Sequence, residues 1–161
     1  MSNALPTRPR HMTQRRAFAI VASQYNYEYV QGLLENARRE LGVVSPGATI
    51  AQYEVPGAFE IPLIVQEIAA HGGIDAILAL GVIIEGQTQH ARLVAEVVTD
   101  SLMRLALHYK VPVIHEVLLV ADEAQARARC LEPELNRGVE AARAAVRISQ
   151  VFQETKKRND G

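Results

Sequence analysis

An apolar run, "IDAILALGVII", occupies residues 74–84 and is interrupted only by Asp75 near its start. Such a run is typical of a strand covered on both faces, because a strand with one solvated face alternates apolar and polar side chains. Strands of that kind occur in parallel sheets, whose crossover connections place helices on both faces. The run therefore predicts a central parallel strand in an α/β protein.

The rest of the chain alternates strand and helix patterns. Strands are expected at residues 17–23, 49–55, 74–84 and 111–120, and helices at 27–41, 57–73, 88–110, about 122–131 and 137–156. Pro62 is tolerable only in the first turn of its helix. This order predicts a parallel sheet between helices, joined by right-handed crossovers.

Length, charge and cysteine content narrow the class of protein. The 161 residues suit one domain, and the net charge of −1 favours neither nucleic acid nor an anionic membrane as a partner. There is no apolar run that could span a bilayer and no secretory signal at the start. The single cysteine, Cys130, excludes an intrachain disulfide framework. We therefore expect a soluble cytoplasmic protein, in which Cys130 is a buried, unreactive thiol.

Ligands of parallel α/β sheets bind outside the carboxyl ends of the strands. After the first strand, Tyr25 could stack on a planar heterocycle or be an ordinary surface tyrosine. After the second, Gly57 permits close approach of the backbone to a ligand. Glu60 falls in a first helical turn, where a carboxylate suits the helix dipole with or without a ligand. Each of these signals is weak alone.

The third strand end, "EGQTQH" at residues 85–90, is more specific. A polar loop that enters a helix offers free N–H groups and a positive dipole end, which together bind phosphate. Thr88 could donate its hydroxyl to an anion or simply cap the helix. His90 could transfer protons near neutral pH, although a lone helical histidine is more often structural or solvated.

Arginines follow the fourth strand. Arg127 and Arg129 point in different directions on a helix, so they should not share a role, and Arg129 could clamp a phosphate bidentately. The sequence has no zinc-ligand spacing, phosphate-binding glycine loop, dinucleotide fingerprint or nucleophile elbow. The other histidines, His11, His71, His108 and His115, form no metal-ligand pattern.

Four segments taken together resemble the lumazine synthase family. They are "VPGAFEIP", "LGVIIEGQTQHARLV", "VPVIHEVLLV" and "NRGVEAA", in this order, and the resemblance extends from about residue 17 to 149. It implies a flavodoxin-like three-layer α/β/α sandwich with a four-stranded parallel sheet, assembled into homopentamers. Residues 1–14 would be an extension, flexible or added to a neighbour's sheet. Residues 15–156 would form the domain, and 157–161 a frayed tail.

The resemblance also implies a reaction. The family's enzymes are transferases that condense 5-amino-6-(D-ribitylamino)uracil with 3,4-dihydroxy-2-butanone 4-phosphate, the penultimate step of riboflavin biosynthesis. The products would be 6,7-dimethyl-8-ribityllumazine, phosphate and water. Neither a metal nor an organic cofactor is expected, and riboflavin synthase is a candidate pathway partner.

The family's site residues carry over by motif. Tyr25 would stack on the pyrimidine, with Asn26 beside it, and His90 would be the general acid/base. Glu60 would bond the ribityl chain, within a block that also contains Gly57, Ala58 and Phe59. The backbone of Val82, Ile83 and Ile84 would read the heterocycle, and Gln87 and Thr88 would bind phosphate. A neighbouring subunit would supply Arg129 to the phosphate, His115 near the ring and Arg137 near the pyrimidine.

This chain departs from the common family pattern at several positions. Glu85 and Arg137 stand where many members have arginine and lysine respectively, and His115 stands where many have phenylalanine. The segment "RCLEPELNRG" at residues 129–138 replaces a Gly- and Lys-rich turn found in many members that form icosahedral shells. A pentamer is therefore the favoured expectation, and a higher assembly, either a decamer or a sixty-subunit shell, stays open.

The sequence leaves two other functions to compare with this one. A pentamer with an aromatic site could store or sense riboflavin or a lumazine, or serve mainly as a shell, but storage would not require a phosphate site. A flavodoxin-like electron carrier needs a phosphate loop after the first strand, and "SQYNYEY" at residues 23–29 has neither glycine nor a Ser/Thr cluster. Turnover is the favoured hypothesis.

Overall fold

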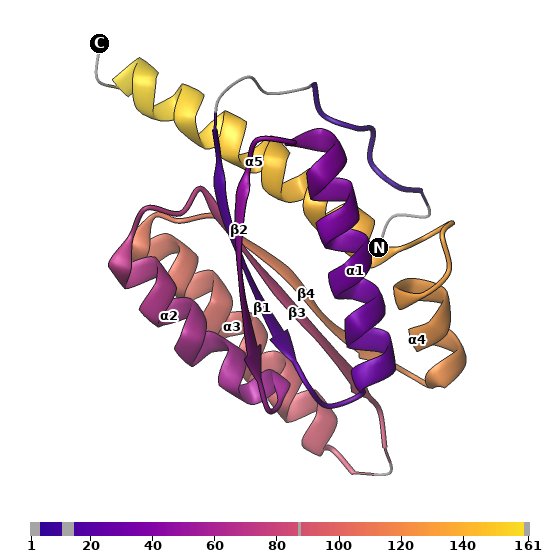
Figure 1. The fold of residues 1–161 in the computed structure, drawn as a ribbon. Helices are drawn as coiled ribbons and strands as arrows, with labels where there is room; N and C mark the ends of the chain where they lie inside the picture. The colour runs from indigo at the N-terminus through magenta and orange to yellow at the C-terminus, as the bar shows by residue number, and fades with distance from the viewer. Residues whose placement is uncertain (1–3, 11–14, 87, 160–161) are drawn as a thin grey trace.

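The structure, a computed structural model, describes residues 4–10, 15–86 and 88–159. Its centre is one parallel sheet in the order β2-β1-β3-β4 (Figure 1). The strands are β1 (Ala17–Ser23), β2 (Thr49–Val55), β3 (Ala76–Ile84) and β4 (Val113–Val120). The first seven residues of β3 are buried, because β3 lies between two strands and between two helix layers. The apolar run therefore marks an inner strand, as predicted.

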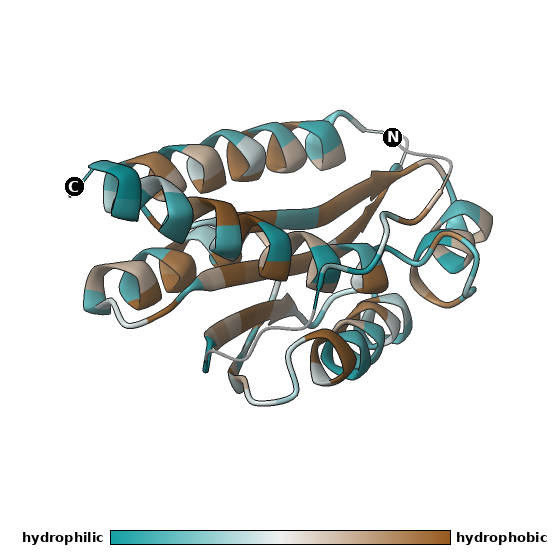
Figure 2. Cartoon of the chain, turned by 90° about the horizontal axis from the view of Figure 1, so that it is seen from above, coloured by the Kyte–Doolittle hydropathy of each residue, from teal (hydrophilic) through white to brown (hydrophobic). Residues whose placement is uncertain are grey.

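Helices cover both faces of the sheet. They are α1 (Tyr27–Val44), α2 (Ile61–His71), α3 (His90–Tyr109), α4 (Glu123–Cys130) and α5 (Arg137–Asn159). Helices α2 and α3 cover one face, and α1, α4 and α5 cover the other (Figure 1). Each face has its own apolar core, and the strands between them are mostly hydrophobic along their length (Figure 2). The predicted three-layer α/β/α sandwich with a four-stranded parallel sheet is confirmed.

Some element bounds differ from the sequence expectation. The segment 57–73 divides into a short 3-10 turn, η1 (Ala58–Glu60), and α2, with Pro62 in the first turn of α2 as expected. Proline is accepted there because the N–H that it lacks would have no intrahelical partner. Helix α3 begins at His90 rather than residue 88, and α5 continues to Asn159 rather than ending at residue 156.

The first residues of the described chain lie against its own helices. Arg8 forms an ion pair of 2.8 Å with Glu40 of α1, and the carbonyl oxygen of Pro6 accepts a hydrogen bond from Arg143 of α5. Addition of this segment to a neighbour's sheet stays a prediction. Within the described residues, no helix is both long and apolar enough to cross a membrane.

Sheet order decides where a site can form. Strands β1 and β3 are neighbours, but the chain leaves β1 toward β2 on one side and reaches β3 on the other. The connections therefore diverge at the carboxyl ends of β1 and β3, which leaves a crevice between the loops that follow them. Tyr25 and Asn26 follow β1, and the loop that leads to His90 follows β3.

Candidate active site

Most of the predicted site residues line one cavity of about 710 Å³ at the carboxyl ends of β1, β2 and β3, which we call the first cavity. It collects Tyr25, Asn26, Gly57, Ala58, Phe59, Glu60, Val82, Ile83, Ile84, Thr88 and His90. Gln87, predicted to bind phosphate with Thr88, lies outside the described residues. The loops after three separate strands therefore meet in one place.

The wall that α3 gives to this cavity was not predicted as part of the site. Leu93, Val94 and Val97 line it together with His90. Their spacing of three and four residues places them on one face of the helix. That apolar stripe is visible in the sequence, but a stripe of this kind more often packs into a core than lines a site.

Gly57 allows Tyr25 to border the cavity. A Cβ atom on Gly57 would lie 2.9 Å from the Tyr25 ring, so any larger residue would force the ring to shift. Glu60 supports the same turn, because its Oε2 accepts the Gly57 N–H at 2.8 Å. The Oε1 atom of Glu60 has no partner among the described residues, so it can still accept a hydrogen bond from a ligand hydroxyl.

Asn26 connects the loop after β1 to β3. Its backbone is left-handed, with φ of 56°, a conformation that asparagine tolerates better than most residues. Its side-chain N–H donates to the carbonyl oxygen of Val82 at 2.8 Å. This bond occupies one of the backbone groups predicted to read the heterocycle, and it holds the loop after β1 against the end of β3.

The loop into α3 leaves its polar groups available. The residue before the first turn is Gln89, whose side chain makes no capping hydrogen bond, so Thr88 is not the N-cap residue considered as its alternative role. The first backbone N–H groups of α3 have no intrahelical partners, which makes this end suitable for an anion. An ion pair of 2.9 Å between Glu85 and Arg92 spans the loop. His90 is exposed at the start of the helix, within the first cavity.

The three remaining predicted residues line a second cavity, also about 710 Å³, along the outer edge of β4. His115 comes from β4, Arg129 from α4 and Arg137 from α5. The two cavities have no lining residue in common, because different faces of α3 border them. One chain therefore separates the residues predicted for its own subunit from those predicted to serve a neighbour.

His115 is held against α3. Its Nε2 lies 2.8 Å from Oγ1 of Thr99, whose hydroxyl also donates to the carbonyl oxygen of Ala95 at 2.7 Å. Because the hydroxyl proton is used on Ala95, Thr99 is left to accept from Nε2–H of His115. Burial lowers the pKa of His115, which favours the neutral ring. Thr99 was not predicted from the sequence.

Arg129 is the strongest candidate for an anion ligand in the second cavity. Its Nη1 is buried and has no hydrogen-bond partner among the described residues. A buried donor without a partner costs about 1–3 kcal/mol, so a ligand that accepts from it is favoured. Arg127, two residues earlier, points elsewhere and lies 3.5 Å from Glu28 of α1. The two side chains point in different directions, as predicted, and their separate roles stay a prediction.

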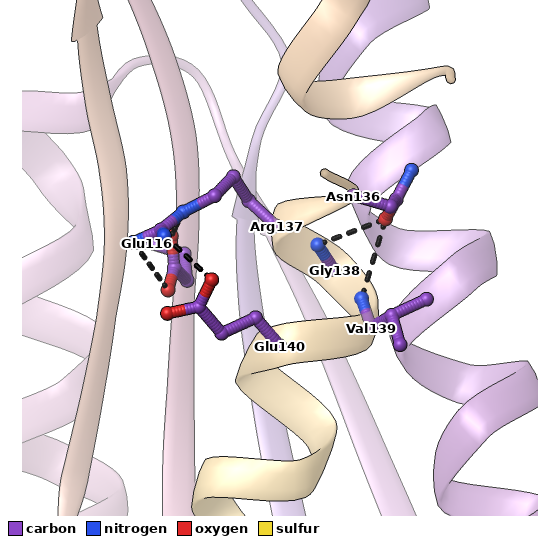
Figure 3. Close-up of polar contacts among 6 residues, drawn as sticks. All are labelled: Glu116, Asn136, Arg137, Gly138, Val139 and Glu140. Atoms are coloured by element: carbon purple, nitrogen blue, oxygen red, sulfur yellow. Dashed lines mark hydrogen bonds and ion pairs between the residues drawn. The ribbon is translucent and has the colours of Figure 1, made fainter. Parts of the chain in front are cut away.

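Arg137 has carboxylate partners instead. Its Nε and Nη2 donate to the two carboxylate oxygens of Glu116, at 3.0 and 3.3 Å, and its Nη1 donates to Glu140 at 2.6 Å (Figure 3). Asn136 caps this helix, because its Oδ1 accepts from the N–H groups of Gly138 and Val139 at 3.0 and 3.2 Å. Capping fixes the start of α5 and so the origin of the Arg137 side chain.

Glu116 is a charged residue that sequence reasoning missed. A signal was present, since a carboxylate within the apolar strand "VIHEVLLV" must find a partner if it is buried. The pattern of the strand could not identify Arg137 as that partner. The pair joins residues 21 positions apart on different elements, which depends on how α5 packs.

A third cavity, of about 1080 Å³, is not the candidate site. It lies between the first residues of the chain and α5, and its lining includes Arg10, Arg16, Arg143 and Arg147. No residue predicted for the site borders it, nor does any histidine or aromatic ring in the described part of the chain. The described residues also contain no cluster of three or more His, Cys, Asp or Glu that could hold a metal ion.

Comparison with known proteins identifies the family. A family model described as 6,7-dimethyl-8-ribityllumazine synthase matches residues 15–153. The protein of that name from Polaromonas sp. is 35% identical over 139 residues, which cover 86% of this chain and 88% of the relative. The one from Stenotrophomonas maltophilia is 38% identical over 138 residues, covering 85% and 89%. The one from Burkholderia multivorans is 38% identical over 135 residues, covering 82% and 75%. The chain therefore belongs to the 6,7-dimethyl-8-ribityllumazine synthase family.

Proposed function

We propose that this protein is a transferase of riboflavin biosynthesis, which condenses 5-amino-6-(D-ribitylamino)uracil with 3,4-dihydroxy-2-butanone 4-phosphate. The products are 6,7-dimethyl-8-ribityllumazine, phosphate and water. Membership of the family supports the reaction. The observation that carries its location is the first cavity, which places an aromatic ring, a carboxylate and a histidine around one helix N-terminus.

The pyrimidine binds between the loops after β1 and β2 in this proposal. The side chain of Tyr25 is 70% exposed at the cavity rim, so one face of its ring is available for stacking. Glu60 accepts hydrogen bonds from the ribityl hydroxyls through its unpaired Oε1. The backbone at the end of β3 contacts the edge of the heterocycle.

The phosphate binds at the start of α3. Thr88 and the first N–H groups of the helix supply hydrogen-bond donors there, and the helix dipole favours the negative charge. Arg129 of a neighbouring subunit completes the phosphate site with its buried, unpartnered Nη1. Holding the phosphate in this way stabilises it as a leaving group while its C–O bond breaks.

His90 transfers protons in this proposal. The amine of the pyrimidine attacks the ketone to form an imine with loss of water, phosphate is then eliminated, and ring closure releases a second water. Each step moves a proton, and a positioned imidazole contributes typically 10²–10⁴-fold to such transfers. His90 begins α3, so it lies close to the proposed phosphate and to the carbons that lose protons.

A complete site requires two subunits in this proposal, assembled as a homopentamer. The two cavities are separate within one chain, so His90 and Arg129 can act on one substrate only if they come from different copies. Exposed apolar residues support burial of this surface against a neighbour. Phe59, Leu93 and Val97 line the first cavity, and Leu63 of α2 and Met103 and Leu107 of α3 are also exposed.

The cellular setting is part of the same proposal. A cytoplasmic location is supported by the one cysteine, Cys130, which is a buried free thiol. Riboflavin synthase is the proposed pathway partner, because it would consume the lumazine product. The substrates are small molecules, and neither nucleic acid nor a membrane is required.

One assay tests the function. The purified protein is mixed with both substrates, and lumazine is followed by its absorbance or fluorescence, with the butanone phosphate omitted as the control. We expect lumazine to form at a rate proportional to protein concentration. A protein that binds riboflavin or the pyrimidine but forms lumazine no faster than the uncatalysed mixture would be a storage or sensing protein, and the proposal would be wrong.

A further inference from the structure

Glu116 is a buried carboxylate on the edge strand of the sheet. Only 4% of it is exposed, in a strand whose other buried residues are apolar. Side chains alternate along a strand, so His115 contacts α3 while Glu116 faces the opposite helix layer. A buried carboxylate is costly unless it is paired and hydrogen-bonded. Its partner therefore indicates what it does.

That partner is Arg137, which lines the second cavity. The two side chains are 5% and 11% exposed, and they meet in a two-point contact that fixes the plane of the guanidinium. Glu140, one turn further along α5, takes a third N–H group. An arginine has five N–H donors, so two remain for a ligand.

The charges around the two cavity arginines differ. Arg129 has no carboxylate partner among the described residues, so its positive charge suits a phosphate. Arg137 has two carboxylates in contact, so an anion beside it would meet Glu116 and Glu140 as well. Its two remaining donors therefore suit a neutral acceptor, such as a carbonyl oxygen of a pyrimidine.

We propose that Glu116 is a positioning residue, which orients and neutralises Arg137 so that it donates hydrogen bonds to the uncharged pyrimidine and leaves the phosphate to Arg129. This inference rests on the proposed function and on the expectation from the sequence that Arg137 lies near the pyrimidine in a site shared with a neighbouring subunit. Pre-orientation lowers the entropy lost on binding, because the long side chain is already held in one conformation.

Titration of Glu116 offers a signature of this role. Burial raises the pKa of Glu116 to about 7, although the positive charge and the hydrogen bonds of Arg137 lower the pKa of this carboxyl. The other titratable groups near it are Glu140 on α5 and Cys130 on α4. Burial raises the pKa of the Cys130 thiol to about 12, so this thiol stays neutral. The carboxylate therefore weakens as a partner of Arg137 when the pH falls below about 7.

A simpler structural role would be different. Inward-pointing charges on edge strands also discourage pairing with other sheets, and that role would not involve the substrate. Glu40 is a matched comparison, because it is a carboxylate 5% exposed that pairs with Arg143 and Arg8, away from both cavities. Removing the charge of Glu40 therefore shows how the loss of a buried ion pair, without any contact to substrate, affects the enzyme.

The experiment compares Glu116→Gln with Glu40→Gln in the steady-state assay with both substrates. At about pH 8, where Glu116 is ionised, Glu116→Gln should raise the KM for the pyrimidine about ten-fold, or about 1.4 kcal/mol, and leave the KM for the butanone phosphate within about two-fold. Glu40→Gln should change neither KM. The ratio of variant to wild-type pyrimidine KM should shrink toward one as the pH falls below about 7.

Other outcomes distinguish a failure of the positioning role of Glu116 from a failure of the assignment of Arg137 to the pyrimidine. If Arg137→Ala raises the pyrimidine KM but Glu116→Gln does not, the positioning role is wrong and the site assignment stands. If Arg137→Ala leaves the pyrimidine KM unchanged, Arg137 is not a substrate ligand and that part of the proposed function is wrong. Equal effects of Glu116→Gln on both KM values, or effects matched by Glu40→Gln, would also overturn the positioning role.

Glu116→Asp keeps the experiment decisive if the glutamine variant does not fold. Aspartate retains the charge but is one methylene shorter, so it cannot reach Arg137 with the same two-point geometry. We expect the pyrimidine KM to rise by less than in the glutamine variant, with the butanone phosphate KM again unchanged. A wild-type pyrimidine KM in a folded Glu116→Asp protein would contradict the requirement for this geometry.

Discussion

The position of the Tyr25 ring depends on Gly57, a residue far from it in the sequence. Its ring lies against Gly57, and most of its surface is exposed, so replacing it should not disturb the core. Tyr25→Ala should weaken riboflavin or pyrimidine binding by about 1 kcal/mol, roughly five-fold, through lost stacking. Tyr25→Phe keeps the ring and should bind like the wild type, as measured by calorimetry. A large loss in the phenylalanine variant would mean that the hydroxyl binds the ligand and that stacking is the wrong explanation.

Arg127 and Arg129 form a matched pair two residues apart on α4. Arg129→Ala should weaken capture of the butanone phosphate, because it removes a buried donor that has no partner within the described part of the chain. The loss should be about 2–4 kcal/mol, and pyrimidine binding should stay unchanged. Arg127→Ala removes only a surface ion pair with Glu28 and should be silent in both measurements. Equilibrium titration of each substrate analogue tests this, and weaker pyrimidine binding with normal phosphate binding in Arg129→Ala would reverse the assignment.

Helices α1 and α5 approach each other closely because of one glycine. A Cβ atom on Gly138 would collide with the backbone carbonyl of Leu33, so Gly138→Ala must push the helices apart. We expect it to destabilise the protein by about 1–3 kcal/mol. Gly42, within α1, has open space around its Cα, so Gly42→Ala should stabilise by about 0.5–1 kcal/mol. Denaturant unfolding would measure both, and equal effects would mean that the contact with Leu33 does not limit the packing.

The contact between β4 and α5 should depend on pH. Burial raises the pKa of Glu116 from 4.5 to about 7 on folding, so the folded chain binds this proton more tightly than the unfolded chain. Its contribution to stability is therefore fully present below pH 4.5 and is lost as the pH rises through about 7. Relative to Glu116→Gln, the unfolding free energy of the wild type should fall by an amount on the order of 1–3 kcal/mol across this range. Unfolding curves recorded at a series of pH values would measure this difference. If the difference does not change with pH, Arg137 keeps Glu116 ionised throughout.

Helix α3 separates the two parts of the proposed shared site. One of its faces borders the first cavity and another borders the second, so a single chain keeps His90 and Arg129 apart. The two residues can meet only across an interface between copies. The exposed apolar side chains on α3, among them Leu93 and Leu107, are consistent with such an interface.

Complementation between inactive variants tests this sharing. His90→Ala and Arg129→Ala proteins should each have low activity, and mixing them after dissociation and reassembly should restore part of it. Some interfaces in the mixed oligomers would then combine an intact His90 with an intact Arg129. The control is each variant dissociated and reassembled alone. Mixed oligomers that form properly but recover no activity would show that the site lies within one subunit.

Local patterns in the sequence determined the kind and order of the secondary structure. The apolar run at residues 74–84 is a buried inner strand, and the alternation of strand and helix patterns forms a parallel sheet between two helix layers. These features follow from side-chain periodicity, which acts over a few residues and can be read directly. The rule that ligands bind at strand ends then located the first cavity, because all parallel strands end at the same edge.

The tertiary structure alone decided how distant side chains pair. Nothing in the local pattern joins Glu116 to Arg137, presses Tyr25 onto Gly57, or leaves Nη1 of Arg129 buried without a partner. Nor does it assign the two faces of α3 to separate cavities. Each of these arrangements depends on the register of strands and the packing of helices. Both are set by the burial of the whole core, because that burial offsets the entropy of ordering segments far apart in the chain.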